Sequence, residues 1–137
     1  RRVLFRSPIF AYLADCIISH NMWFATDDYT IEQYEKYGLK QLTPPYAQPV
    51  QFNRNPILFI LALADTLEPI KTCSNLDISP LDVLNNIECE FNHKQITLAF
   101  KNNDMFNKMT DKINRSTNWL DINVHINNKN NEIVVIF

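Results

Sequence analysis

The segment from Ile87 to Phe100 reads IECEFNHKQITLAF and decides the fold class of this chain. In each half of it, large apolar residues occupy every second position, and the positions between them are polar or charged except for Ala99. Successive side chains of a strand point to opposite faces, so this period of two predicts two strands, each with one apolar face. The polar pair His93-Lys94 separates the halves and predicts a turn. We therefore expect a β-hairpin.

A helix and a second pair of strands follow this hairpin. Residues Met105–Trp119 carry apolar side chains at helical spacing, and Ile122–Ile126 and Ile133–Phe137 return to a period of two. An asparagine-rich loop joins the last two segments, where Asn tolerates left-handed backbone. The order ββαββ predicts a four-stranded antiparallel sheet with the helix on its apolar face. We expect Phe91 and Phe106 in the core between them.

Residues 8–85 show helical spacing and loops instead. We predict helices that begin at Pro8 and at Pro56, a short helix over Thr30–Tyr37 and another over Pro80–Asn85. Pro69 should kink or end the helix that begins at Pro56. In the first helix, five residues fall on one face at helical spacing and form an apolar stripe: Ile9, Leu13, Cys16, Ile17 and Phe24. We expect apolar surface to stay exposed on the helices Ala11–Trp23 and Ile57–Leu67, where missing N-terminal helices would have packed.

These two halves predict an α+β chain, with a helical domain at residues 8–85 and a small antiparallel ββαββ subdomain at residues 86–137. The opening Arg1–Ser7 resembles translated sequencing-adapter sequence and holds three of the five arginines of the chain, so we exclude it from the fold. The alternative is a genuine basic start of a longer protein. On either interpretation we expect the natural N-terminal part to be missing.

Composition excludes several classes of function. The formal charge is -2, and it becomes -5 without the three leading arginines, with 10 basic against 15 acidic residues. An acidic chain is not expected to bind nucleic acid independently of sequence. No apolar run reaches the roughly 20 residues that cross a bilayer, so no membrane partner is expected. The single glycine, Gly38, leaves no P-loop or dinucleotide fingerprint. Three cysteines without a CxxC pair suit a reducing, cytoplasmic setting.

The residues that could carry chemistry lie in the helical half. Nine residues from Pro56 to Ala64 have no charge and no hydrogen-bonding side chain, which predicts a helix buried on every side. Asp65 follows directly, and a buried carboxylate is costly unless a metal, a cation or several donors meet it. His20 lies within the apolar stripe of the first helix. An imidazole and a carboxylate together suit Fe, Mn or Zn.

Plainer interpretations of both residues stay open. A single histidine on an apolar stripe is also typical of a hydrogen-bonded core residue. Asp65 could equally be a helix cap or the ion-pair partner of Lys71 or Arg54.

The order of these pieces resembles the second half of an HD-superfamily metal-dependent phosphohydrolase, in particular the bacterial HD hydrolases that cleave diadenosine tetraphosphate. In those enzymes a helix ends in an isoleucine, two residues and a ligand histidine, as Ile17-Ile18-Ser19-His20 does here. A later helix carries Ala-Asp, two residues and Glu-Pro, as in Ala64-Asp65 and Glu68-Pro69. The resemblance covers roughly residues 8–73 and implies a partial, mainly helical HD-like domain.

The resemblance also implies a divalent metal centre that turns a bound water into the nucleophile for a phosphate ester. Asp65 matches the final Asp ligand of the family and His20 a later His ligand. Four further residues are implied at the edge of the pocket, with the last as a cation for a phosphate: Asn21, Thr66, Glu68 and Lys71. The chain departs from the family in having no His-Asp doublet, which we expect to lie upstream or to have been lost. Asn21 stands where some relatives have a second His or a Thr.

Two functions follow. The first is a fragment of a metal-dependent phosphohydrolase that acts on a small phosphorylated substrate such as a nucleotide, with the fragment alone inactive. The second is a catalytically silent HD-like domain that binds a ligand or partner through its α+β tail. A homodimer formed through the tail stays open. Substrate identity stays open too, because such enzymes share the metal centre and differ in their pocket walls.

Overall fold

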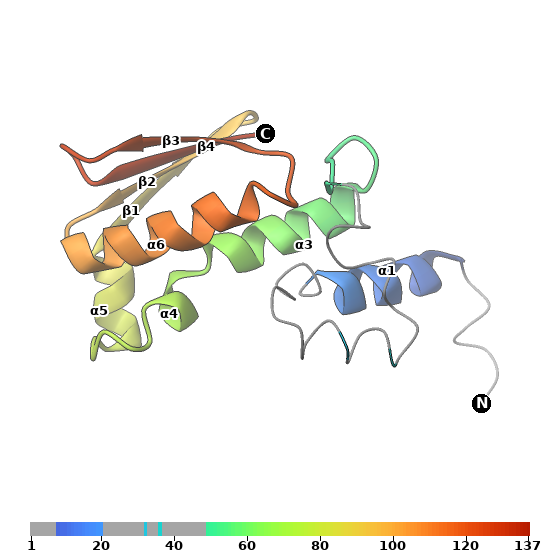
Figure 1. The fold of residues 1–137 in the computed structure, drawn as a ribbon, viewed down its shortest axis with the longest axis horizontal. Helices are drawn as coiled ribbons and strands as arrows, with labels where there is room; N and C mark the ends of the chain where they lie inside the picture. The colour runs from blue at the N-terminus through green and yellow to red at the C-terminus, as the bar shows by residue number, and fades with distance from the viewer. Residues whose placement is uncertain (1–7, 21–31, 33–35, 37–48) are drawn as a thin grey trace. The chain divides into compact units, whose positions relative to one another are not determined.

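The structure is a computed structural model and describes residues 8–20, 32, 36 and 49–137 (Figure 1). The chain divides into two compact units, Arg1–Asp65 and Thr66–Phe137. The predicted α+β class is confirmed, since helices accompany a four-stranded antiparallel sheet. Most of the predicted helix Thr30–Tyr37 falls outside the described residues, although Glu32 and Lys36 within it are helical. The described helices include none with both the length and the apolar content of a membrane span.

Helix α1 (Pro8–Ser19) begins at the proline predicted for its first position. Only part of its apolar stripe is buried. Cys16 is buried, whereas Ile9 and Ile17 are 59% and 61% exposed. Apolar surface on this helix is therefore exposed, as expected, because helical spacing defines a wide face of which packing buries only a part. Phe24 of the stripe lies outside the described residues.

Helix α3 (Pro56–Leu67) also begins where predicted, at the proline after Asn55. Phe59, Ala62 and Leu63 are buried, but Ile60 is 55% exposed. The helix is therefore not buried on every side, and Ile60 belongs to the exposed apolar surface expected on Ile57–Leu67. A uniformly apolar composition does not reveal on how many sides a helix has neighbours, and much of the surface of any folded protein is apolar.

Two short helices precede the sheet in the second unit. Helix α4 (Pro69–Thr72) begins two residues after α3 ends, because Pro69 lacks the N–H that would continue the preceding helix. Helix α5 (Pro80–Asn85) has the predicted bounds. The Ser79 hydroxyl accepts a hydrogen bond from the Asp82 N–H at 3.2 Å and caps the start of α5.

The ββαββ order is confirmed. Strands β1 (Ile87–Phe91) and β2 (Gln95–Phe100) form the predicted hairpin, helix α6 (Asn103–Ser116) follows, and β3 (Asn123–Asn127) and β4 (Glu132–Ile136) form a second hairpin. The strands lie in the order β1-β2-β4-β3 with every pair antiparallel. The two hairpins therefore join along β2 and β4.

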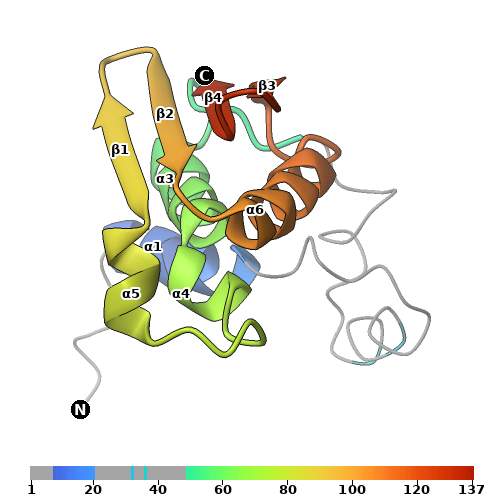
Figure 2. The same ribbon diagram turned by 90° about the vertical axis from the view of Figure 1, so that its left-hand side faces the viewer.

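The core of the second unit lies between α6 and one face of the sheet (Figure 2). The ring centroids of Phe100 and Phe106 are 6.1 Å apart across this layer. Helix α6 ends three residues earlier than predicted, yet Trp119 and Leu120 beyond it remain buried. The other large buried side chains of the layer are Leu98, Met105, Met109, Ile113, Ile133 and Val135.

Two asparagines support the turns and caps as expected. The Asn102 carboxamide oxygen accepts hydrogen bonds from the N–H groups of Asp104 and Met105 at 2.9 and 3.0 Å and caps α6. Asn131, in the asparagine-rich loop, has a φ of 50°, a left-handed conformation that Asn adopts more readily than most residues.

Phe91 departs from the prediction. Its side chain is 82% exposed, so its placement in the core was wrong. Helix α6 contacts β2 and β3, whereas β1, one of the two outer strands, borders α5 (Figure 2). The side chain points to the apolar side of the sheet, as its position in the alternation requires, but α6 does not cover that part of the sheet.

Stability measurements distinguish the two phenylalanines. Phe106→Ala should lower the free energy of unfolding by about 3–5 kcal/mol, because it leaves a cavity in a packed core. Phe91→Ala should change it by less than about 0.5 kcal/mol, as expected for an exposed side chain. Urea unfolding followed by far-UV circular dichroism measures both. If both variants lost the same free energy of unfolding, the conclusion that Phe106 is packed in the core and that α6 leaves Phe91 uncovered would be wrong.

Candidate functional site

His20 lies just beyond the end of α1 and is half-buried. Its Nδ1 lies 2.6 Å from the carbonyl oxygen of Ile17. Since a carbonyl oxygen only accepts, Nδ1 donates in this hydrogen bond. An imidazole whose Nδ1–H is held by a backbone carbonyl presents Nε2 as the ligand atom, which is the arrangement common among metal-binding histidines.

Asp65 lies in the last turn of α3 and is half-buried. It belongs to the same unit as His20. The Tyr12 side chain of α1 hydrogen-bonds with the backbone of Ile57 in α3. His20 lies eight residues after Tyr12, and Asp65 lies eight residues after Ile57.

The described residues do not complete a metal site. No group of three or more His, Cys, Asp or Glu side chains that could hold a metal ion occurs among them. Asn21, implied by the resemblance at the edge of the pocket, lies outside the described residues. His20 and Asp65 are two candidate donors, whereas hydrolytic metal sites use at least three protein ligands.

Glu68 has a structural role. Its two carboxylate oxygens accept hydrogen bonds from the backbone N–H groups of Ile70 at 2.7 Å and Lys71 at 2.9 Å. Its carbonyl oxygen accepts from the Thr72 hydroxyl at 2.7 Å. A carboxylate at this position satisfies backbone donors that the first turn of α4 leaves unpaired. The side chain of Lys71 itself is exposed.

Thr66 is fully buried, and its hydroxyl has no hydrogen-bond partner among the described residues. A fully buried hydroxyl cannot contact a phosphate that stays in solvent. Cys73 is also fully buried. Burial raises the pKa of its thiol and the nearby Glu68 acts in the same direction, while Lys108 and Lys112 oppose the shift. A neutral buried thiol of this kind is a packing group and a poor nucleophile.

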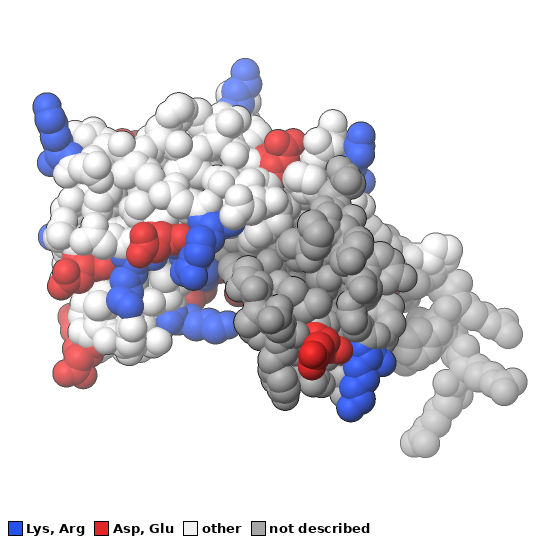
Figure 3. All heavy atoms as spheres, viewed as in Figure 1, with Lys and Arg blue, Asp and Glu red and all other residues white. Residues whose placement is uncertain are grey.

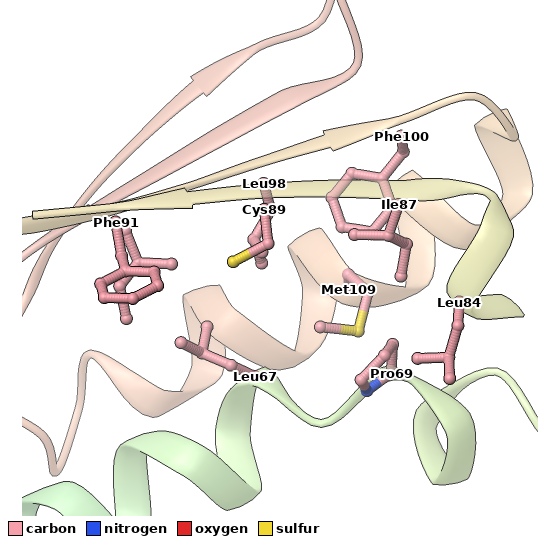
Figure 4. Close-up of a pocket in the computed structure, with 10 residues that line it drawn as sticks. Leu67, Pro69, Leu84, Ile87, Cys89, Phe91, Leu98, Phe100 and Met109 are labelled. Atoms are coloured by element: carbon pink, nitrogen blue, oxygen red, sulfur yellow. The ribbon is translucent and has the colours of Figure 1, made fainter.

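A hollow in the second unit was not anticipated from the sequence. It has a volume of about 320 Å³ and lies on the side of the sheet where Phe91 is exposed (Figure 4). The sheet lines one wall with Ile87, Cys89, Phe91, Ile96, Leu98 and Phe100. Leu67, Pro69, Leu84 and Met109, from the helical segments, line the other.

This cavity is chemically uniform. All ten lining residues are apolar or, in the case of Cys89, weakly polar, and Figure 4 shows the Cys89 sulfur and the Phe91 ring directed into the hollow. Its volume is at the lower end of the range for small-molecule sites, about 300–1,000 Å³. An apolar hollow of this kind favours apolar groups and offers nothing to replace the water around a charged group.

Charge is mixed elsewhere on this unit. On the face of the second unit turned to the viewer in Figure 3, Lys and Arg side chains are interspersed with Asp and Glu. The described ion pair Lys101–Glu88 has a distance of 3.0 Å and lies on the exposed surface. A surface that binds nucleic acid without sequence preference gathers basic side chains on one face, and the face in view does not.

Comparisons with known proteins give no match: no family model, no curated protein and no solved structure matches this chain.

The cap at Glu68 can be tested directly. Glu68→Ala should lower the free energy of unfolding by about 1 kcal/mol, because two backbone N–H groups lose their acceptor. Lys71→Ala, three residues away and exposed, is the matched control and should have an effect within about 0.5 kcal/mol. Thermal and urea unfolding measure both variants. An unchanged stability of Glu68→Ala would return this carboxylate to the candidates for the edge of a phosphate pocket.

Proposed function

We propose that the second unit, Thr66–Phe137, is a binding module that takes an apolar group of a ligand or partner into the cavity below β1. The observation that carries this proposal is the cavity of about 320 Å³, which is lined by apolar side chains and is open where Phe91 is 82% exposed. Exposed apolar hollows of this size on a folded unit are characteristic of binding sites.

The chemistry of the lining limits what can enter. No Lys, Arg, His, Asp or Glu is among its ten residues, so a phosphate or carboxylate placed there would lose its hydration without gaining donors. The group that binds is therefore uncharged and apolar. A phosphorylated substrate would have to bind elsewhere on the protein.

A metal-dependent phosphohydrolase is the second candidate function. It is supported by the resemblance of residues 8–73 and by the hydrogen bond between His20 Nδ1 and the Ile17 carbonyl, a bond that metal-binding histidines commonly make. In this function His20 and Asp65 would be ligands of an Fe, Mn or Zn ion, and that ion would supply an activated water.

A metal titration tests the second candidate. Mn(II) binding to the chain, measured by electron paramagnetic resonance, should be weak, because two protein ligands leave most coordination positions to water. His20→Ala and Asp65→Ala should each weaken it further, and the exposed His125→Ala is the control that should not. Unchanged binding in both of the first two variants would place any bound metal elsewhere and remove this candidate.

A neutral probe tests the binding module. Toluene added to methyl-labelled protein should shift the methyl signals of Ile87, Ile96 and Leu98 in a saturable way, since small aromatic hydrocarbons occupy apolar cavities of this kind. Cys89→Trp should fill the cavity and abolish the shifts. His125→Trp introduces the same side chain on the opposite face of the sheet, at strand β3, and should leave the shifts intact.

Two outcomes of the toluene experiment would contradict the proposal. Shifts spread evenly over the exposed methyl groups of both units would indicate non-specific contact. Shifts that persist in Cys89→Trp would show that toluene binds outside the cavity.

A further inference from the structure

The strand that bounds the cavity is also an outer strand of its sheet. The strand order is β1-β2-β4-β3, and in the part of the chain that the structure describes no strand pairs with the other side of β1 (Figure 2). An uncovered outer strand presents backbone N–H and C=O groups that can pair with another extended chain.

The hydrogen-bond pattern shows which groups of β1 point outward. The Asn92 N–H donates to the Gln95 carbonyl at 3.0 Å, and the Lys101 N–H donates to the Asn86 carbonyl at 2.9 Å. Hydrogen-bonded and non-hydrogen-bonded pairs alternate in an antiparallel ladder, so Glu88 and Glu90 use their backbone groups toward β2. The backbone groups of Ile87, Cys89 and Phe91 therefore point away from the sheet.

The residues with outward backbone groups are the β1 residues that line the cavity. Ile87, Cys89 and Phe91 border the hollow, and Figure 4 shows the last two directed into it. The intervening Glu88 and Glu90 are exposed and lie on the opposite face, since successive side chains of a strand alternate. A strand added beside β1 would thus have one face over the cavity and the other beside two carboxylates.

We infer that the partner of this module is an extended peptide in which apolar residues alternate with Lys or Arg, added antiparallel to β1 as a fifth strand. This inference rests on the proposed binding function of the cavity. The backbone groups of Ile87, Cys89 and Phe91 pair with the peptide, its apolar residues lie over the cavity, and its basic residues lie opposite Glu88 and Glu90. Strand addition of this kind takes affinity from the backbone and specificity from alternate side chains.

The negative charges of Glu88 and Glu90 favour a basic peptide over a second copy of the chain as the partner. When two β1 strands pair antiparallel along most of their length, Glu88 or Glu90 of one faces Glu88 or Glu90 of the other, and like charges directly opposite are destabilising. A basic side chain removes this conflict. Lys101 of the chain itself pairs with Glu88 at 3.0 Å, which shows that a carboxylate on this face of β1 accepts a cation.

The experiment uses the full chain and a nine-residue peptide in which Val and Lys alternate around a central Leu. Isothermal titration calorimetry at low salt measures binding, and hydrogen exchange measured by NMR follows single amides. The outward amides of Ile87, Cys89 and Phe91 should exchange freely in the free protein and become protected when the peptide binds. Methylation of the central Leu nitrogen, whose N–H would face β1, should abolish binding, whereas methylation of a neighbouring Lys nitrogen should not.

Charge reversal tests the partner chemistry. Glu90→Lys should weaken peptide binding about tenfold, since an attractive cross-strand pair becomes repulsive. Asp111→Lys makes the same change in net charge on the exposed side of α6 and should weaken binding by less than about threefold, because solvent screens distant charges. Both variants should bind toluene as the unmodified chain does, which shows that the cavity is intact.

The outcomes separate this inference from the proposed function. Toluene binding in the cavity without peptide protection of the outward amides overturns the inference and leaves the binding module standing. Equal peptide binding by Glu90→Lys and the unmodified chain also overturns it. Protection of the outward amides that grows with protein concentration alone would identify a second copy as the partner and overturn it as well. Failure of both toluene and peptide overturns the inference together with the proposed function.

Discussion

In the second unit, a single helix is too narrow to cover the whole width of a four-stranded sheet. An α-helix with its side chains is about 10–12 Å wide, whereas the outer strands of a four-stranded sheet are about 14 Å apart at the usual spacing of about 4.8 Å. Helix α6 contacts β2 and β3, with β4 between them. Strand β1 is left beside the short α5, and its apolar side chains are not covered. The core, the exposed Phe91 and the cavity all follow from where this single helix lies.

Local signals in the sequence were sufficient for most of this fold. The period of two in residues 87–100, the turn at His93-Lys94 and the start of α5 at Pro80 depend on neighbouring residues alone. The exposure of Phe91 could not be predicted in the same way. Alternation shows to which face of a sheet a side chain points, but whether that face is covered depends on the position of α6, which is a long-range property. The same reasoning explains Ile60 of α3, where an apolar run did not reveal an exposed side.

The candidate site was less accessible to sequence reasoning than the fold. His20 and Asp65 were identified through a resemblance in spacing, and the structure adds the orientation of one imidazole. The Glu68-Pro69 pair was associated with a pocket, but the same pair is what a capped helix start requires, because Pro suits the first helical position and a carboxylate before it satisfies backbone donors. The apolar cavity had no local signal. The hint that the sequence did contain concerns the whole unit: it has one amphipathic helix for four alternating strands, so part of the apolar face of the sheet is left without a helix.

The strand order has a consequence for how the second unit folds. β1 with β2 and β3 with β4 are hairpins whose partners are close in sequence, and such pairs form within about 1–10 μs. β2 and β4 are neighbours in space, but Leu98 pairs with Ile133, so this contact closes a long loop that contains α6. Long-range pairing carries a large loop-closure entropy and is intrinsically slow. We therefore expect two early hairpins and a rate-limiting step in which α6 packs against both and brings β2 and β4 into register.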